Sequence, residues 1–128
     1  MRGAAGNAVI QDLFVYGTLL DLETRRAVVG RPCRTRVATL AGYARRVGRY
    51  PYLAADATAR TAGRLLLGLT LDELARLDDY EGVAPSQIEG AARRLYTRAA
   101  ADVACLDGRR RPCWVYFANL DEWPPNWR

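Results

Sequence analysis

The chain has 128 residues, half of them hydrophobic, and a formal net charge of +5. It contains no histidine and no lysine, so all 19 positive charges are arginines, and Ser86 is the only serine. These absences exclude a Ser–His or Cys–His nucleophile pair, a lysine Schiff base and a phosphate-binding loop of the GK[ST] type. Any side chain that moves protons is therefore expected to be Asp or Glu.

The length fits one domain, which we expect to span residues 1–128. No segment is apolar enough for a membrane span, and the first residues lack the apolar region of a signal peptide. The three cysteines, Cys33, Cys105 and Cys113, have no CxxC spacing, so we expect them to pack in a reducing cytoplasm. Scattered cysteines and carboxylates are a poor set for zinc, and we expect neither a metal nor a cofactor.

The first half of the chain reads as short elements separated by glycine and proline. Residues 13–16 are predicted as a buried strand, and residues 21–29 as a short helix closed by Gly30. Extended segments are expected at residues 37–43 and 52–55, and a central strand at residues 61–69.

The strongest helix signal begins at Thr70, which forms a capping box with Glu73 and precedes leucines at 71, 74 and 77. Gly82 lies where a helix-terminating glycine belongs. A polar loop is expected at residues 83–94, followed by strands at 96–106 and 113–118 that are joined by a turn at 107–112. Strands outnumber helices, so the pattern predicts an α+β fold with a curved or closed sheet.

Two acids leave this helix from its apolar face near its C-terminal end. At about 100° per residue, Asp78 projects between Leu71 and Leu74, and Glu81 projects between Leu74 and Leu77. Burial and the negative end of the helix dipole would both raise the pKa of Glu81, which suits a general acid or base near neutral pH. The alternative is a frayed helix end from which Glu81 reaches water, and the pattern does not choose between the two.

Residues 25–49 contain eight arginines and no acid. Such a stretch can bind nucleic acid or attract a small anion, but it is also typical of a solvated surface in an arginine-rich chain. Signatures of RNA-binding modules with stacking aromatics are absent, so we favour the solvated surface and expect no nucleic-acid partner.

Five short motifs occur in one order along the chain: VYGTL at 15–19, GRYPYL at 48–53, GRLLLGLTLDELARLDDYEG at 63–82, YTR at 96–98, and WVYFAN at 114–119. With these motifs the sequence resembles the gamma-glutamylcyclotransferase-like family over residues 13–118. The resemblance implies a small mixed β-barrel or roll with flanking short helices. It also implies an enzyme that cyclises a gamma-glutamyl group and releases 5-oxoproline together with a free amine or amino acid.

The resemblance assigns the catalytic general acid/base to Glu81, the residue that the helical face also selects. It assigns substrate binding to six positions: Tyr16, Gly17, Thr18, Leu19, Tyr96 and Tyr116. In the family's reaction the substrate's own α-amine attacks its γ-carbonyl, so no protein nucleophile is required. The turn after residue 16 is expected to open toward a helix N-terminus, where free backbone N–H groups could bind the substrate carboxylate or a developing oxyanion.

Other interpretations stay open at this point. The chain could be a tailoring enzyme that removes a gamma-glutamyl protecting group, or a non-catalytic small-molecule-binding protein with the same fold. A basic nucleic-acid-binding protein is the third class. We expect substrate selectivity to vary in the loop at 83–94, which contains a second acid, Glu89, in no catalytic spacing. The sequence carries no signal for the oligomeric state, for the group on the far side of the substrate, or for a role of the C-terminal tail.

Overall fold

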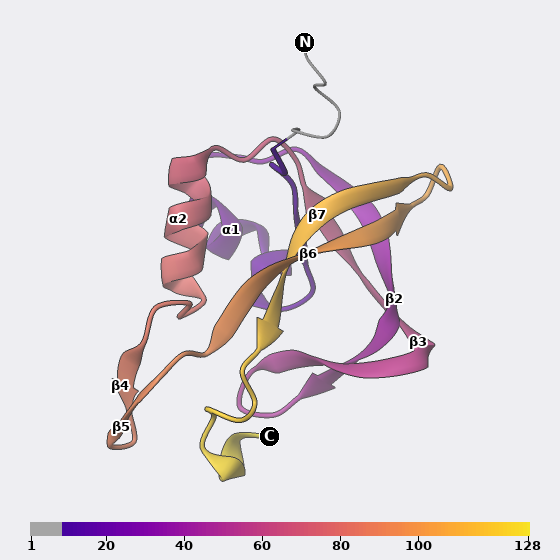
Figure 1. Ribbon diagram of the computed structural model, residues 1–128. Coiled ribbons are helices and arrows are strands. Elements are labelled where there is room, and N and C mark those ends of the chain that lie inside the picture. Colours follow the sequence, from indigo (N-terminus) through magenta and orange to yellow (C-terminus); the bar gives the residue numbers. More distant parts are fainter. Residues whose placement is uncertain (1–8) are drawn as a thin grey trace.

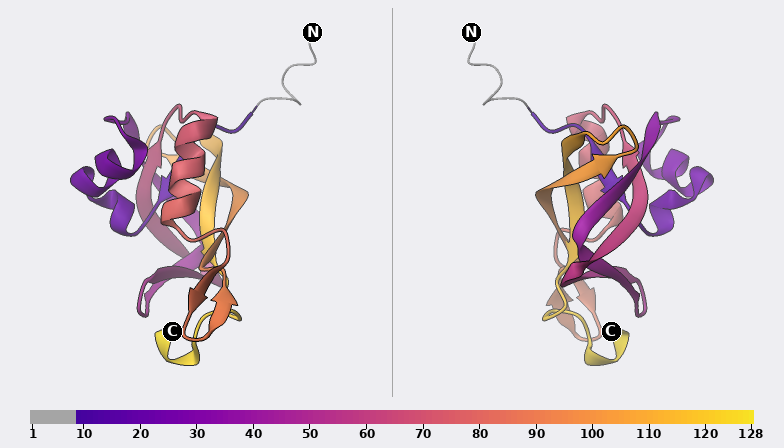
Figure 2. Two further views of the ribbon diagram at one scale, coloured as in Figure 1. Left: turned by 90° about the vertical axis from the view of Figure 1, so that its left-hand side faces the viewer. Right: turned by 90° about the vertical axis from the view of Figure 1, so that its right-hand side faces the viewer.

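The computed structural model describes residues 9–128, which form a closed five-stranded β-barrel with two helices against one side (Figure 1 and Figure 2). The barrel strands are β1 (Leu13–Val15), β2 (Thr35–Val47), β3 (Pro51–Leu66), β6 (Tyr96–Cys105) and β7 (Arg110–Ala118). The helices are α1 (Leu22–Val29) and α2 (Leu71–Tyr80), and a separate hairpin consists of β4 (Ser86–Ile88) and β5 (Ala91–Arg93). The expected mixed barrel with flanking short helices is confirmed.

The barrel closes around the short strand β1. It pairs antiparallel with β3 and parallel with β7, and the ring continues in the order β1–β3–β2–β6–β7. The long strands β2 and β3 pair with each other, and their register shifts between Ala41 and Tyr43, where Gly42 has a φ of 89°. Such a bulge bends the sheet and allows it to close.

Side chains of β1 alternate between two parts of the core, as the pleat of a strand requires. Phe14 and Tyr16 pack inside the barrel with residues of β2, β3, β6 and β7. Leu13 and Val15 pack on the other side, against the helices and the C-terminal tail. The turn that follows β1 is thereby fixed from both sides.

Helix α2 forms as its sequence predicts. The Thr70 hydroxyl accepts from the Glu73 N–H and the Glu73 carboxylate accepts from the Thr70 N–H, which completes the capping box. Leu74 and Leu77 are fully buried against the barrel, whereas Leu71 is exposed and not part of the buried face that we expected. The helix ends at Tyr80, and Gly82, two residues later, has a φ of 66°, a left-handed conformation that favours glycine.

Other predicted boundaries change more. Residues 52–55 and 61–69, expected as separate extended segments, belong largely to the single strand β3. The loop expected at 83–94 contains the β4–β5 hairpin, whose two-residue turn is Glu89–Gly90. The turn expected at 107–112 is shorter, because β7 begins at Arg110 and not at residue 113, whereas β6 ends at Cys105, one residue before the predicted end.

The C-terminal tail, which has no periodicity in the sequence, packs against the barrel. Trp123 and Trp127 are buried, and their rings meet Tyr50 and Tyr52 edge to face. The Trp127 carbonyl accepts a 2.6 Å hydrogen bond from the backbone N–H of Arg49, so the tail holds the β2–β3 turn. None of the helices within residues 9–128 combines the length and the hydropathy that a bilayer crossing requires.

Candidate active site

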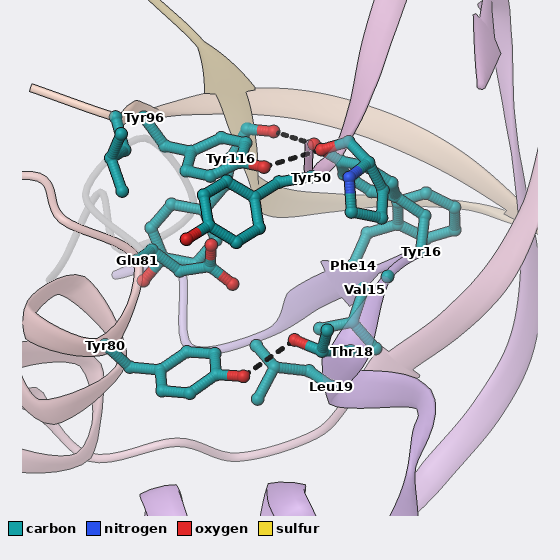
Figure 3. Close-up of a pocket in the computed structure, with 13 residues that line it drawn as sticks. Phe14, Val15, Tyr16, Thr18, Leu19, Tyr50, Tyr80, Glu81, Tyr96 and Tyr116 are labelled. Carbon is teal, nitrogen blue, oxygen red and sulfur yellow. Dashed lines mark hydrogen bonds between the residues drawn. The ribbon is translucent and has the colours of Figure 1, made fainter. Parts of the chain in front are cut away.

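A pocket of about 260 Å³ opens between the end of α2, the turn after β1 and the β2–β3 turn (Figure 3). It is lined by residues from distant parts of the chain: Phe14, Val15, Tyr16, Gly17, Thr18, Leu19, Tyr50, Pro51, Tyr80, Glu81, Leu95, Tyr96 and Tyr116. All seven site residues that the sequence analysis selected are in this set. Most of the wall is aromatic or aliphatic, and among the lining residues within 9–128 only Glu81 has a charged side chain.

Glu81 is the residue immediately after α2, and the end of the helix fixes its backbone. Its N–H donates to the Leu77 carbonyl at 2.9 Å, and the next two N–H groups, of Gly82 and Val83, donate to carbonyls of the last helical turn. The helix end is therefore closed, not frayed. Because Leu77 is fully buried one turn earlier, the Glu81 side chain is directed into the pocket (Figure 3).

Burial raises the pKa of the Glu81 carboxyl from 4.5 to about 7, with desolvation as the single cause. Within residues 9–128 no cation and no hydrogen-bond donor offsets this effect. A carboxyl with that pKa is populated in both protonation states at neutral pH, so it can accept a proton and return it.

Asp78, the second acid on the same helical face, is in a different situation. Its carboxylate accepts two hydrogen bonds from the Arg98 guanidinium, at 2.8 and 3.1 Å, and a third at 2.6 Å from the Tyr116 hydroxyl. Arg98 in turn lies 4.4 Å from the centre of the Trp114 ring. Asp78 is thus part of a satisfied network that fixes Tyr116, and of these two acids only Glu81 has a carboxyl without a hydrogen-bond partner among residues 9–128.

Three tyrosines form the wall, and their hydroxyls are committed to protein partners. Tyr16 donates to the Tyr116 carbonyl at 2.5 Å, and Tyr96 donates to the Pro51 carbonyl at 2.5 Å. Tyr116 donates to Asp78. Burial raises the pKa of all three phenols far above neutral, and the nearby Glu81 charge adds to this shift. These tyrosines can shape the pocket with their rings but are not set up as acids or bases at neutral pH.

The turn after β1 lies across the pocket from Glu81 (Figure 3). Residues Thr18–Leu20 form one turn of 3-10 helix, and Asp21 caps α1 through its side chain. The N–H groups at the start of such a turn have no acceptor within it, so those of Gly17, Thr18 and Leu19 are available to a ligand. Gly17 packs closely on Pro51, whose Cγ would lie 3.3 Å from an added Cβ.

Two further tyrosines, Tyr50 and Tyr80, lie at the mouth of the pocket and were not selected from the sequence. They are the most exposed of the aromatic lining residues, at 37% and 43%. The Tyr80 hydroxyl forms a 2.8 Å hydrogen bond with the Thr18 hydroxyl, which links the end of α2 to the turn (Figure 3). Both residues stand inside motifs that the sequence displays, GRYPYL and LDDYEG, but exposure at a pocket mouth has no signature in a single sequence.

Comparisons with solved structures recover this fold. A solution structure of an Arabidopsis thaliana protein superposes with a TM-score of 0.72 and 25% identity, over 92% of this chain and 74% of the other. A structure described as a gamma-glutamyl cyclotransferase superposes with a TM-score of 0.68, over 85% of this chain and 66% of that one. Because the sequence identity to this second structure is only 17%, the similarity shows a shared fold and nothing more.

Sequence comparisons agree with the structural ones. AIG2-like protein C of Arabidopsis thaliana is 40% identical over 75 residues, which cover 56% of this chain and 44% of that protein. AIG2-like protein D of the same plant is 34% identical over 82 residues, covering 62% and 54%. The chain therefore spans about half the length of the curated relatives it matches. The family model described as "Gamma-glutamyl cyclotransferase, AIG2-like" matches residues 13–127, and the chain belongs to this family.

Proposed function

We propose that this protein is a gamma-glutamyl cyclotransferase-type enzyme that releases 5-oxoproline and a free amine or amino acid from a small gamma-glutamyl compound. The observation that carries the proposal is the free Glu81 carboxyl, with a pKa raised to about 7, across a pocket from a turn with available N–H groups. Family membership supports the same reaction class.

In this reaction the substrate folds so that its α-amine nitrogen approaches its own γ-carbonyl carbon. The new C–N bond closes a five-membered ring, and the Glu81 carboxylate accepts the proton that the amine loses. The original amide C–N bond then breaks, and the same proton passes from Glu81 to the departing nitrogen. The steps consume no water and leave the enzyme in its starting state.

The pocket favours this folding step in two ways. Its rigid aromatic wall, formed by Tyr16, Tyr96 and Tyr116, limits the space available to an extended substrate. The turn at Gly17 to Leu19 presents N–H donors to the α-carboxylate or to the oxyanion that develops on the γ-carbonyl oxygen. The leaving amine would lie toward Tyr50 and Tyr80 at the mouth.

A panel of gamma-glutamyl amines, amino acids and peptides, assayed for 5-oxoproline by chromatography, tests the proposal. At least one compound should yield 5-oxoproline and its amine in equal amounts. A non-catalytic binding protein, the alternative, would bind such compounds and leave them intact. If every compound remained intact after incubation with a large excess of enzyme, the proposed activity would be contradicted.

The cytoplasm stays our predicted location.

A further inference from the structure

Trp123, in the C-terminal tail, contacts the wall of the pocket from outside. It is 1% exposed and is not itself a lining residue. Its ring meets the rings of Tyr50 and Tyr96 edge to face, with centroids 6.3 and 5.7 Å apart. Both tyrosines line the pocket, so one tail residue supports two parts of the wall, one from the β2–β3 turn and one from β6.

The same side chain also bonds the backbone of a third lining residue, Leu95. The indole N–H of Trp123 donates to the Leu95 carbonyl over 2.8 Å, and the Asn119 N–H donates to the same carbonyl over 2.9 Å. The Leu95 N–H donates in turn to the Gly82 carbonyl over 2.9 Å. Leu95 belongs to no strand, and these three bonds fix its backbone between the tail and the end of α2.

Gly82, which Leu95 holds, directly follows Glu81 in the chain. A glycine permits a wider range of backbone angles than other residues, so the contacts of Gly82 decide how the chain leaves the helix end. The Leu95 side chain packs over Gly82 so closely that an added Cβ would lie 3.1 Å from the Leu95 Cβ. Helix α2 thus fixes the backbone before Glu81, and Leu95 fixes the backbone after it.

We propose that Trp123 is a positioning residue for catalysis, because it holds Leu95 against the backbone that carries Glu81. The inference rests on the proposed function and extends it to a residue outside the pocket. Trp123 acts through Leu95 and Gly82 and does not touch the substrate. Without the indole N–H, Leu95 and Gly82 should move more freely, and the Glu81 carboxyl should spend less time within reach of the substrate amine.

The test removes this N–H and keeps an aromatic ring in its place. Trp123→Phe should lower kcat for 5-oxoproline release about tenfold per folded molecule, while KM stays within a few-fold of wild type. The same change is then made in Glu81→Gln and measured with enzyme in excess over substrate. If Trp123 acts through Glu81, its loss should have no further effect in that background, whereas a merely structural role would lower both rates equally.

Trp127→Phe is the matched control. It makes the same change in the same tail, on a buried ring that also meets Tyr50 and Trp123 edge to face. Within residues 9–128, however, the bonds to the Leu95 carbonyl come from Trp123 and Asn119. Trp127→Phe should therefore lower the unfolding temperature but leave kcat within a few-fold of wild type.

A tryptophan analogue with sulfur in place of the indole N–H keeps the shape of the ring, so it carries the test if Trp123→Phe does not fold. Amide hydrogen exchange adds a readout that is independent of activity. In either variant the Leu95 N–H should exchange about tenfold faster than in wild type, and the amides that pair β2 with β3 should change less.

Equal losses of turnover with and without the Glu81 carboxyl, or an unchanged exchange rate at Leu95, would overturn the inference. Failure of the proposed function would look different. The wild-type protein would then release no 5-oxoproline from any substrate, although exchange at Leu95 would still respond to the loss of the Trp123 N–H.

Discussion

Two partly enclosed glutamates, Glu73 near the start of α2 and Glu81 just after its end, have pKa values shifted in opposite directions. At the start of the helix, hydrogen bonds from Arg31 and Thr70 lower the pKa of Glu73 from 4.5 to about 2. At the end, burial without a partner raises the pKa of Glu81 to about 7. The start of the helix thus holds a carboxylate with several partners, and its end is followed by a carboxyl that has none among residues 9–128. Desolvation acts on both carboxyls, but only Glu73, which is 6% exposed, has hydrogen-bond partners that outweigh it.

The largest expected effect is the loss of turnover when Glu81 is replaced. Glu81→Gln keeps the shape of the side chain but cannot exchange a proton, so 5-oxoproline release should fall by about 100-fold to 10,000-fold. Glu89→Gln makes the same chemical change on the exposed β4–β5 turn and is the matched control. Near-normal turnover in Glu81→Gln would mean that another group transfers the proton.

The same variant should be at least as stable as wild type at pH 8. A folded-state pKa above 4.5 means that the carboxyl supports the fold below about pH 4.5, and that this support is lost as pH rises through about 7. The advantage of Glu81→Gln over wild type should therefore grow between these two values. Urea unfolding at several pH values measures it, and a variant less stable than wild type at pH 8 would argue that Glu81 has a hidden partner.

At the other end of the helix, Glu73→Gln should lower the free energy of unfolding by about 1–2 kcal/mol, because the capping box and the bonds to Arg31 both weaken. Here the sign with pH is reversed. The stabilisation is present above pH 4.5 and is lost as pH falls through about 2, so the difference from wild type should shrink in acid. Turnover per folded molecule should stay within a few-fold of wild type. A large fall in kcat would show that Glu73 also contributes to turnover and would contradict the distinction between the two glutamates.

The smallest effect concerns the link between the helix end and the turn. Tyr80→Phe removes the hydroxyl that bonds Thr18 but keeps the ring at the pocket mouth. Because this bond is exposed, kcat/KM should fall only a few-fold and the unfolding temperature should barely move. Thr18→Val should give a similar loss, and the double variant should add little to either. Full additivity of the two losses would show that the two hydroxyls act separately.

Local signals made much of this site predictable from the sequence. Thr70 and Glu73 fix where α2 starts, Gly82 fixes where it ends, and the leucine spacing between them selects the face on which Glu81 lies. The family resemblance supplied the turn at Tyr16–Leu19 as the opposite wall. Both depend on short stretches of chain, for which a single sequence is informative.

Long-range features escaped prediction for physical reasons. Periodicity placed Asp78 and Glu81 on one face but could not distinguish them, because the partners of Asp78 are Arg98 and Tyr116, from strands far along the chain. The fusion of two predicted segments into β3 depends on pairing with β2 across a bulge. Packing of the C-terminal tail depends on Trp123 and Trp127 meeting the β2–β3 turn, and no local period encodes that contact.

The central claim, that the half-buried Glu81 carboxyl has a raised pKa because it lacks a partner, can be measured directly. Carbon-detected NMR of protein labelled at the glutamate side-chain carboxyls, with Glu81→Gln used to assign the signal, follows its titration. We predict a pKa near 7 for Glu81. A titration near the ordinary value of 4.5 would contradict the account, because a carboxylate of that low basicity would be a poor acceptor for the proton that the amine loses.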